Sequence, residues 1–295
     1  MFEKILLPLD GSELAECVLP YGQEFASRLG SELILFHVCS PEHKNYNRMH
    51  SLYLETVAKT VIKNIKKSRP KGEVNVHAES LIGEPVDTIA NYIRQNGINL
   101  MMMTSAGASG IKLWVLGSVA DKAFRAVNIP TMLVRCVESS AGAKKKSINR
   151  LLVTLDGSKA SNKALPVAGE LAKQFKASIT LFQMVERIGM KEGFEGVEVG
   201  GGDVYAKFGT LEEKKVKGHL LNAAKGLRNK NIPVTYKYSR GFDAAEQIIA
   251  MEKSTGADIV IMATRGASPV SRWMFGSTAE KVLRQGTVPL LLVRE

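Results

Sequence analysis

The sequence predicts an α/β fold in two tandem copies, each with a parallel sheet and helices on both faces. Short apolar runs rich in β-branched residues alternate with longer amphipathic stretches, an order typical of parallel strands joined by right-handed helical crossovers. The run LLPLDGS at 6–12 returns as LVTLDGS at 152–158, an offset of 146 (156 − 10). At 295 residues the chain is long enough for two domains with a core each.

Each half is predicted to contain five strands. In the first half, Ser12 is the expected cap of the first helix and Gly30 is its end. The strands of this half are expected at residues 4–9, 32–39, 73–78, 99–103 and 131–134. Its helices are expected at residues 13–29, 49–67 and 85–96, with a polar loop at 41–47 and a fourth helix after residue 117.

A glycine-bounded loop occurs once in each half, between a strand and a helix that Ser277 or Thr278 is expected to cap in the second copy. Both copies read G-x9-G-S and lie 159 positions apart (266 − 107): Gly107, Gly117 and Ser118, then Gly266, Gly276 and Ser277. The first turn of a helix offers unpaired N–H groups and roughly half a positive charge. Glycine lets a phosphate approach the backbone because no Cβ intervenes. The loop is neither a Walker A nor a GxGxxG motif, and it predicts an anion site.

The two halves are separated by a short stretch of linker composition. Residues 139–146 are rich in small residues and lysine, so we place one domain at 1–138 and the other at 147–295. The second half is longer by 13 residues (159 − 146), which fall within 187–208, and six glycines there disfavour a stable helix. We consider three roles for 187–208: a lid over a nearby site, a docking surface for a partner, and a passive insertion.

Composition argues against a nucleic-acid-binding or membrane-spanning protein. The net charge is +11 with a pI near 9.5, but the lysines are spread over predicted helix faces, so no specific nucleic-acid binding is expected. No apolar run approaches the roughly 18 residues of a membrane span, and the N-terminus leads into a strand rather than a signal peptide. Cys17, Cys39 and Cys136 form no CxxC pair and no metal spacing, which favours a reducing cytoplasm. The histidines match no metal or catalytic spacing and are predicted to be structural or surface residues.

The segments LLPLDGSELAE and LLVTLDGSKAS, each followed by G-x9-G-S and a closing apolar strand, resemble tandem universal stress protein domains. The resemblance covers nearly the whole chain. It implies a five-stranded parallel sheet of flavodoxin-like, adenine nucleotide α-hydrolase-like layout in each half. It also implies an adenine nucleotide, usually ATP and with Mg²⁺ left open, across the carboxyl ends of the strands. The family signature is G-x2-G-x9-G-[S/T], and this sequence departs from it with Thr104 and Ala263 at the first glycine.

The resemblance assigns site residues by matching positions. Asp10 and Asp156 would face the adenosine end of the nucleotide, although an Asp before Gly-Ser also fits a plain turn. Val38 and Met184 would offer backbone groups to adenine, with a role in the core alone as the alternative. The phosphates would be held by Gly107, Gly117 and Ser118 in one half, and by Gly266, Gly276 and Ser277 in the other. Arg265 could reach a phosphate, with a solvated arginine as the alternative; because the second half adds this residue, we expect it to bind more tightly.

Three functional classes fit the sequence. We favour a nucleotide-binding stress-response or regulatory module with little or no catalysis. An enzyme of related folds is the second class, but the HxGH and SGGxDS signatures do not occur here; weak ATP hydrolysis is left open. The third is a protein-interaction scaffold without nucleotide, which Thr104 and Ala263 keep open.

The repeat also predicts how the fifth strands are used. We expect the two domains to face each other across a pseudo-twofold axis, with residues 131–134 and 290–293 paired or packed together, because exposed strand edges need cover. This arrangement imitates the homodimer common among single-domain relatives. Dimerisation of whole chains and the identity of a protein partner are left open.

Overall fold

A computed structural model describes residues 1–105, 117–136, 147–186, 202–264 and 276–294 of the chain. Among the predicted site residues, Gly107, Arg265 and Gly266 lie outside these ranges. The linker at 139–146 and the first fifteen residues of the insertion (187–201) also lie outside them. The described residues form two compact units, one of residues 1–149 with 283–294 and one of residues 150–282.

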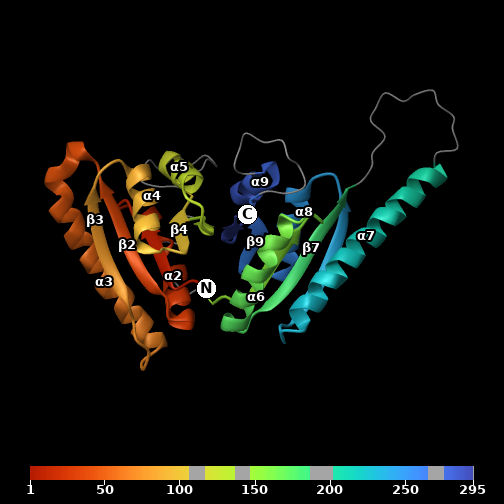
Figure 1. The fold of residues 1–295 in the computed structure, drawn as a ribbon, viewed down its shortest axis with the longest axis horizontal. Helices are drawn as coiled ribbons and strands as arrows, with labels where there is room; N and C mark the ends of the chain where they lie inside the picture. The colour runs from red at the N-terminus through yellow and green to blue at the C-terminus, as the bar shows by residue number, and fades with distance from the viewer. Residues whose placement is uncertain (106–116, 137–146, 187–201, 265–275, 295) are drawn as a thin grey trace. The chain divides into compact units, whose positions relative to one another are not determined.

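The first unit contains a six-stranded sheet in the order β3-β2-β1-β4-β5-β10 (Figure 1). Its strands are β1 (Lys4–Pro8), β2 (Glu32–Cys39), β3 (Val76–Ile82), β4 (Leu100–Thr104), β5 (Thr131–Val134) and β10 (Leu290–Val293). Its helices are α1 (Glu13–Glu16), α2 (Leu19–Leu29), the 3₁₀ helix η1 (Pro41–Tyr46), α3 (Asn47–Ser68), α4 (Pro85–Asn96) and α5 (Ser118–Ala126). Strands β1 to β5 are parallel, as predicted.

Strand β10 comes from the far end of the chain and pairs antiparallel with β5, with Leu291 opposite Met132. The prediction that the two fifth strands pair is therefore confirmed. Arg294, which follows β10, also contacts α5: its guanidinium lies 4.5 Å above the ring of Phe124, and this contact stabilises the pairing of β10 with β5. The edge of β5 is covered by this pairing.

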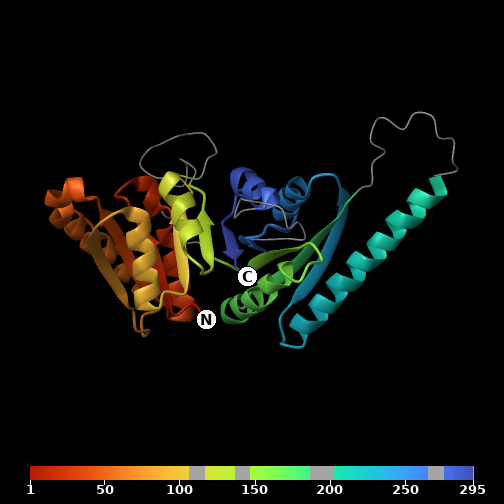
Figure 2. The ribbon, with the colours of Figure 1, turned by 45° about the horizontal axis from the view of Figure 1, so that its top comes forward.

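The second unit repeats the arrangement with the strand order β9-β6-β7-β8, all parallel. Its strands are β6 (Arg150–Leu155), β7 (Ser178–Glu186), β8 (Val234–Gly241) and β9 (Ile259–Ala263). Its helices are the 3₁₀ helix η3 (Ser161–Lys163), α6 (Ala164–Phe175), α7 (Gly202–Arg228), α8 (Ala244–Thr255) and α9 (Ser277–Gln285), whose last residues group with the first unit. Figure 2 shows α7 running alongside β7 and β8.

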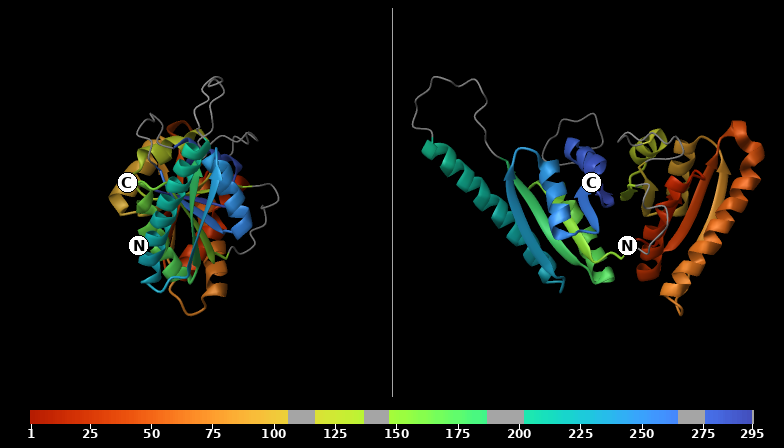
Figure 3. Two further views of the ribbon diagram at one scale, coloured as in Figure 1. Left: turned by 90° about the vertical axis from the view of Figure 1, so that its right-hand side faces the viewer. Right: turned by 180° about the vertical axis from the view of Figure 1, so that it is seen from behind.

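Helices cover both faces of the first sheet, which confirms the predicted fold class. Neighbouring residues of β2 show this, because Phe36 packs on Tyr92 of α4 while His37 stacks on His50 of α3. Figure 3 shows α3 alongside β3. A strand covered on both faces is apolar along its length, and residues 5–7 of β1 are fully buried.

Four predicted elements differ from the structure, and one is the polar loop expected at 41–47, which forms η1 and leads into α3. The helix expected at 13–29 is split into α1 and α2, because Pro20 has no N–H to donate to the carbonyl of Glu16. Strand β3 lies at 76–82 rather than 73–78, in a register that pairs it with β2 as far as Cys39. The insertion ends inside α7, so residues 202–208 are helical; the glycines that disfavoured a helix are all at or before its first residue.

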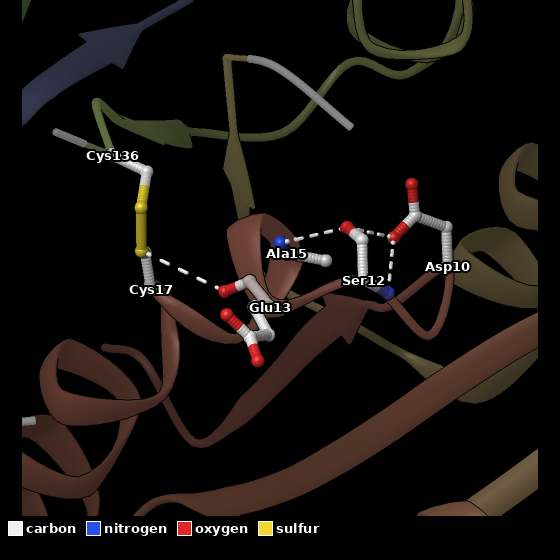
Figure 4. Close-up of a disulfide and its surroundings, with 6 residues drawn as sticks. All are labelled: Asp10, Ser12, Glu13, Ala15, Cys17 and Cys136. Atoms are coloured by element: carbon white, nitrogen blue, oxygen red, sulfur yellow. Dashed lines mark hydrogen bonds between the residues drawn. A yellow bond between two sulfur atoms is a disulfide. The ribbon is translucent and has the colours of Figure 1, made fainter. Parts of the chain in front are cut away.

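Cys17 and Cys136 form a disulfide, with their Cα atoms 5.7 Å apart (Figure 4). It joins the break between α1 and α2 to the end of β5, across 119 residues of sequence. The absence of a CxxC motif did not predict this pair, because spacing along the chain says nothing about proximity in the fold. Cys39 is buried and unpaired.

Asp243 links two helices of the second unit. It caps α8 by accepting the N–H of Glu246 at 3.1 Å, and its other carboxylate oxygen lies 2.5 Å from Nζ of Lys281 on α9. The hydrogen bond from Lys281 is the main reason why the pKa of the Asp243 carboxyl is lowered, and the bond from Glu246 adds to it. The ion-pair contribution to stability is therefore present above the unfolded-state pKa and is lost as the pH falls through the lowered folded-state pKa.

We expect Asp243→Ala to lower the free energy of unfolding by about 1 kcal/mol, because it removes a helix cap. Asp243→Asn keeps a capping oxygen and loses only the charge, so its difference from the wild type should shrink between pH 5 and pH 2.5. Urea denaturation across this pH range measures both effects. Equal stability of the wild type and Asp243→Ala at pH 7 would contradict the assignment.

Candidate functional site

The loop after β1 holds Asp10 in a tight hydrogen-bonded turn (Figure 4). The Asp10 Oδ1 accepts the N–H of Ser12 at 3.0 Å and its hydroxyl at 2.6 Å. The same hydroxyl accepts the N–H of Ala15 at 3.1 Å, so Ser12 caps α1 as predicted. Gly11 has φ of +83°, a backbone conformation that disfavours any other residue. The turn holds an exposed carboxylate at the carboxyl end of β1.

The second unit reproduces this turn after β6. Asp156 Oδ1 accepts the N–H of Ser158 at 2.9 Å, and Gly157 has φ of +84°. Ser158 Oγ accepts the N–H of Ser161 at 3.0 Å, and this bond is equivalent to the one between Ser12 and Ala15 in the first unit. Both aspartates therefore do shape a turn, as the alternative interpretation held. Both are also exposed at the strand end, where a ligand can contact them.

A hydrogen bond ties each of these turns to the long helix that follows the second strand. In the first unit, the hydroxyl of Tyr53 on α3 donates to Glu16 Oε1 at 2.7 Å. Burial and this bond raise the pKa of Tyr53. In the second unit, Asn162 occupies the place of Glu16 at the offset of 146, and its Oδ1 lies 3.0 Å from Nε2 of His219 on α7. These four residues were not among the predicted site residues, although that offset aligns Glu16 with Asn162.

The helix starts predicted to hold phosphates are equivalent in the two units. The N–H of Gly117 donates to the carbonyl of Ser105 at 2.9 Å, and that of Gly276 donates to Thr264 at 3.4 Å. Gly117 is the N-cap of α5, and α9 begins at Ser277. The prediction that Ser277 or Thr278 caps α9 is therefore wrong. A glycine before the helix supplies no side-chain acceptor, so the N–H groups of the first turn are available to an anion.

The substituted motif positions lie inside the sheet. Thr104 and Ala263 are the last residues of β4 and β9, and both are buried. Their side chains belong to the packed end of the strand. The side chains of Thr104 and Ala263, which replace the first glycine of the family signature, are thus accommodated in the core.

A pocket of about 450 Å³ lies beside Val38, at the carboxyl end of β2. It is lined by His37, Val38, Cys39, Ser40, His43, Tyr46, Met49 and His50. Val38 is half-buried, as is Met184 at the equivalent end of β7. The prediction that the histidines are plain structural or surface residues missed this cluster. Across the described residues, no three His, Cys, Asp or Glu side chains are grouped to hold a metal ion.

A model of the universal stress protein family matches residues 1–135 and again residues 147–294. This chain belongs to the universal stress protein family. Universal stress protein Slr1230 of Synechocystis sp. is 22% identical over 313 residues, covering 99% of this chain and 100% of that protein. Universal stress protein YxiE of Bacillus subtilis is 28% identical over 148 residues, 46% of this chain and 100% of that protein.

The fold is shared with solved universal stress proteins. The crystal structure of one from Archaeoglobus fulgidus superposes with a TM-score of 0.70 at 22% identity, covering 100% of this chain and 99% of that one. Within the described ranges, no helix of this universal stress protein is both long and apolar enough to cross a membrane.

We expect Tyr53→Phe to lower the free energy of unfolding by about 1 kcal/mol, because Glu16 loses its hydrogen-bond donor. Tyr46→Phe is the matched control, since Tyr46 is 55% exposed. Urea denaturation of both variants measures the difference. If the two substitutions change stability equally, the bond from α3 does not stabilise the Asp10 turn.

Proposed function

We propose that this universal stress protein binds an adenine nucleotide, ATP in the first place, at the carboxyl end of the sheet in each half. The observation that supports it most is the strand order. The chain leaves β1 toward β2 on one side, and β4 lies on the other side of β1. A parallel α/β sheet opens a crevice at such a switch point, and ligands bind there.

The two loops at this switch point have complementary chemistry. The loop after β1 carries the exposed Asp10, and the chain after β4 returns at Gly117 to begin a helix. A carboxylate suits the hydroxyl groups of a ribose, and a helix start suits a phosphate. The second half repeats the pair with Asp156 and Gly276, beside β6 and β9. One solved universal stress protein was determined in complex with cAMP, and our proposal rests on the loops of this chain rather than on that protein.

We propose a regulatory or stress-response role with little or no catalysis, and a cytoplasmic location. The HxGH and SGGxDS signatures of catalytic relatives are missing from the sequence. Mg²⁺ would be brought by the phosphates of the nucleotide. The competing scaffold hypothesis predicts that no nucleotide binds at all, so a direct titration separates the two.

We expect calorimetric titration with ATP to give two equivalents for the wild type and one for Gly276→Val. Among the described residues, a Cβ added at Gly276 meets only the carbonyl of Thr264, at 4.0 Å, so the added side chain obstructs a phosphate and its Cβ makes no close contact with those residues. Gly117→Val should remove the other equivalent. Gly226→Val on the exposed surface of α7 is the control, because an added Cβ there meets nothing within 4 Å.

Circular dichroism establishes that each variant is folded, and release of inorganic phosphate from ATP reports any hydrolysis. Comparing Gly117→Val with Gly276→Val also tests whether the second half binds more tightly. Two equivalents in Gly276→Val would show that this helix start does not hold phosphate. No binding by the wild type would favour the scaffold.

A further inference from the structure

Three histidines gather around the pocket at the end of β2. His37 comes from β2, His43 from η1 and His50 from α3. The 3₁₀ helix η1 reverses the chain direction after β2, and α3 then returns over the strand end. A volume of about 450 Å³ lies within the range of roughly 300–1,000 Å³ typical of small-ligand pockets.

The innermost histidine is fixed by the turn that carries the exposed aspartate. His37 is 7% exposed, and its Nδ1–H donates to the carbonyl of Leu9 at 2.8 Å. Leu9 directly precedes Asp10. Because a carbonyl can only accept, this bond fixes the proton of neutral His37 on Nδ1. The pocket and the Asp10 turn are therefore joined by one hydrogen bond.

The second histidine lies flat on the first. The rings of His37 and His50 are stacked, with centroids 4.0 Å apart and planes within 18°. Two imidazolium ions at that distance repel each other strongly away from water. His43 stands nearby, with Nδ1 2.9 Å from Ser40 Oγ. The stacked arrangement therefore disfavours charge on both rings at once.

No carboxylate lines this pocket within the described part of the chain. Burial lowers the pKa of His50, and His37 and His43 lower it further. On α1, Glu16 accepts a hydrogen bond from the hydroxyl of Tyr53, which follows His50 along α3. The negative charge of Asp10 contributes to the raised pKa of Tyr53. The charges that act on His50 are thus those of the other two histidines.

The second half lacks this cluster. Gln183 takes the place of His37 at the offset of 146, and its Oε1 lies 2.8 Å from Nδ1 of His219. Nε2 of His219 faces the Asn162 Oδ1. The ring of His219 therefore has two amide groups as neighbours, and protonating it brings no like charge close to another histidine.

We propose that the three-histidine pocket receives the base of the nucleotide, a flat neutral heteroaromatic ring, and admits it only while the histidines are neutral, so that acid releases nucleotide from the first half alone. This inference rests on the proposed nucleotide binding and adds its regulation. A neutral ring entering the pocket removes water from the histidines, which opposes their charged forms. Protons and base therefore compete for the site.

The direction of the pH dependence follows from this competition. The base binds the deprotonated pocket, so affinity is highest at alkaline pH and falls as the pH drops through the titration of the histidines. Each excluded proton lowers affinity by about tenfold per pH unit below that point. Phosphates would be attracted to protonated histidines and act in the opposite sense, so adenosine is the appropriate probe for the base.

The experiment measures adenosine and ATP binding by calorimetry at pH 8.0, 7.0, 6.0 and 5.5. Gly276→Val isolates the first site, and Gly117→Val isolates the second. We expect adenosine affinity at the first site to fall at least tenfold from pH 8.0 to pH 5.5, and affinity at the second site to change less than about threefold. Circular dichroism at each pH checks that the fold persists.

Two substitutions in the Gly276→Val background assign the effect. His37→Gln copies the second half and His50→Gln removes the stacked partner, so the ratio of affinities at pH 8.0 and pH 5.5 should be smaller in each than in Gly276→Val alone. His77→Gln, an exposed histidine on β3 outside the pocket lining, should keep the wild-type ratio. A first site that binds adenosine equally at both pH values overturns the inference and leaves the proposed function intact. No ATP or adenosine binding at pH 8.0 overturns both.

Discussion

Parallel pairing of β1 with β4, and of β6 with β9, is the constraint on which the candidate sites depend. Parallel strands end on the same edge, so the loops that follow them emerge side by side. That geometry brings Asp10 near the start of α5, more than a hundred residues further along the chain, and Asp156 near α9. The strands can pair in this way because their side chains are apolar on both faces, and helices cover both faces.

The site is built from backbone more than from side chains. Gly11 and Gly157 adopt left-handed φ values, which turn the chain sharply enough to expose the preceding aspartate. Gly117 and Gly276 directly precede α5 and α9 and have no side chain to cap them, which makes backbone N–H groups the natural ligands for an anion.

The parts of the fold predicted from sequence are those fixed locally. The repeated LDGS turn, the glycine before α5 and the apolar strands each carry their structure in neighbouring residues. The split of the first helix was also readable locally, because Pro20 inside the expected helix lacks the N–H that a continuous helix needs. The start of α7 could also have been predicted locally, because the last of the six glycines in 187–208 is Gly202, the first residue of the helix.

The other parts that escaped prediction depend on contacts across the chain. The Cys17–Cys136 disulfide spans 119 residues, and no local pattern marks it. The histidine cluster requires η1 to bring His43 and His50 back over His37, whereas residues 41–47 read as a plain polar loop. The position of β3 was set by its register with β2, which its own composition does not specify.

Amide hydrogen exchange with and without ATP tests most directly whether the strand-end edge of each half holds nucleotide. The account predicts slower exchange in the presence of ATP at residues 10–16 and 118–121, and at 156–163 and 277–280, with little change along α8 or at the β5–β10 pair. Protection confined to surfaces away from these turns and helix starts would contradict it.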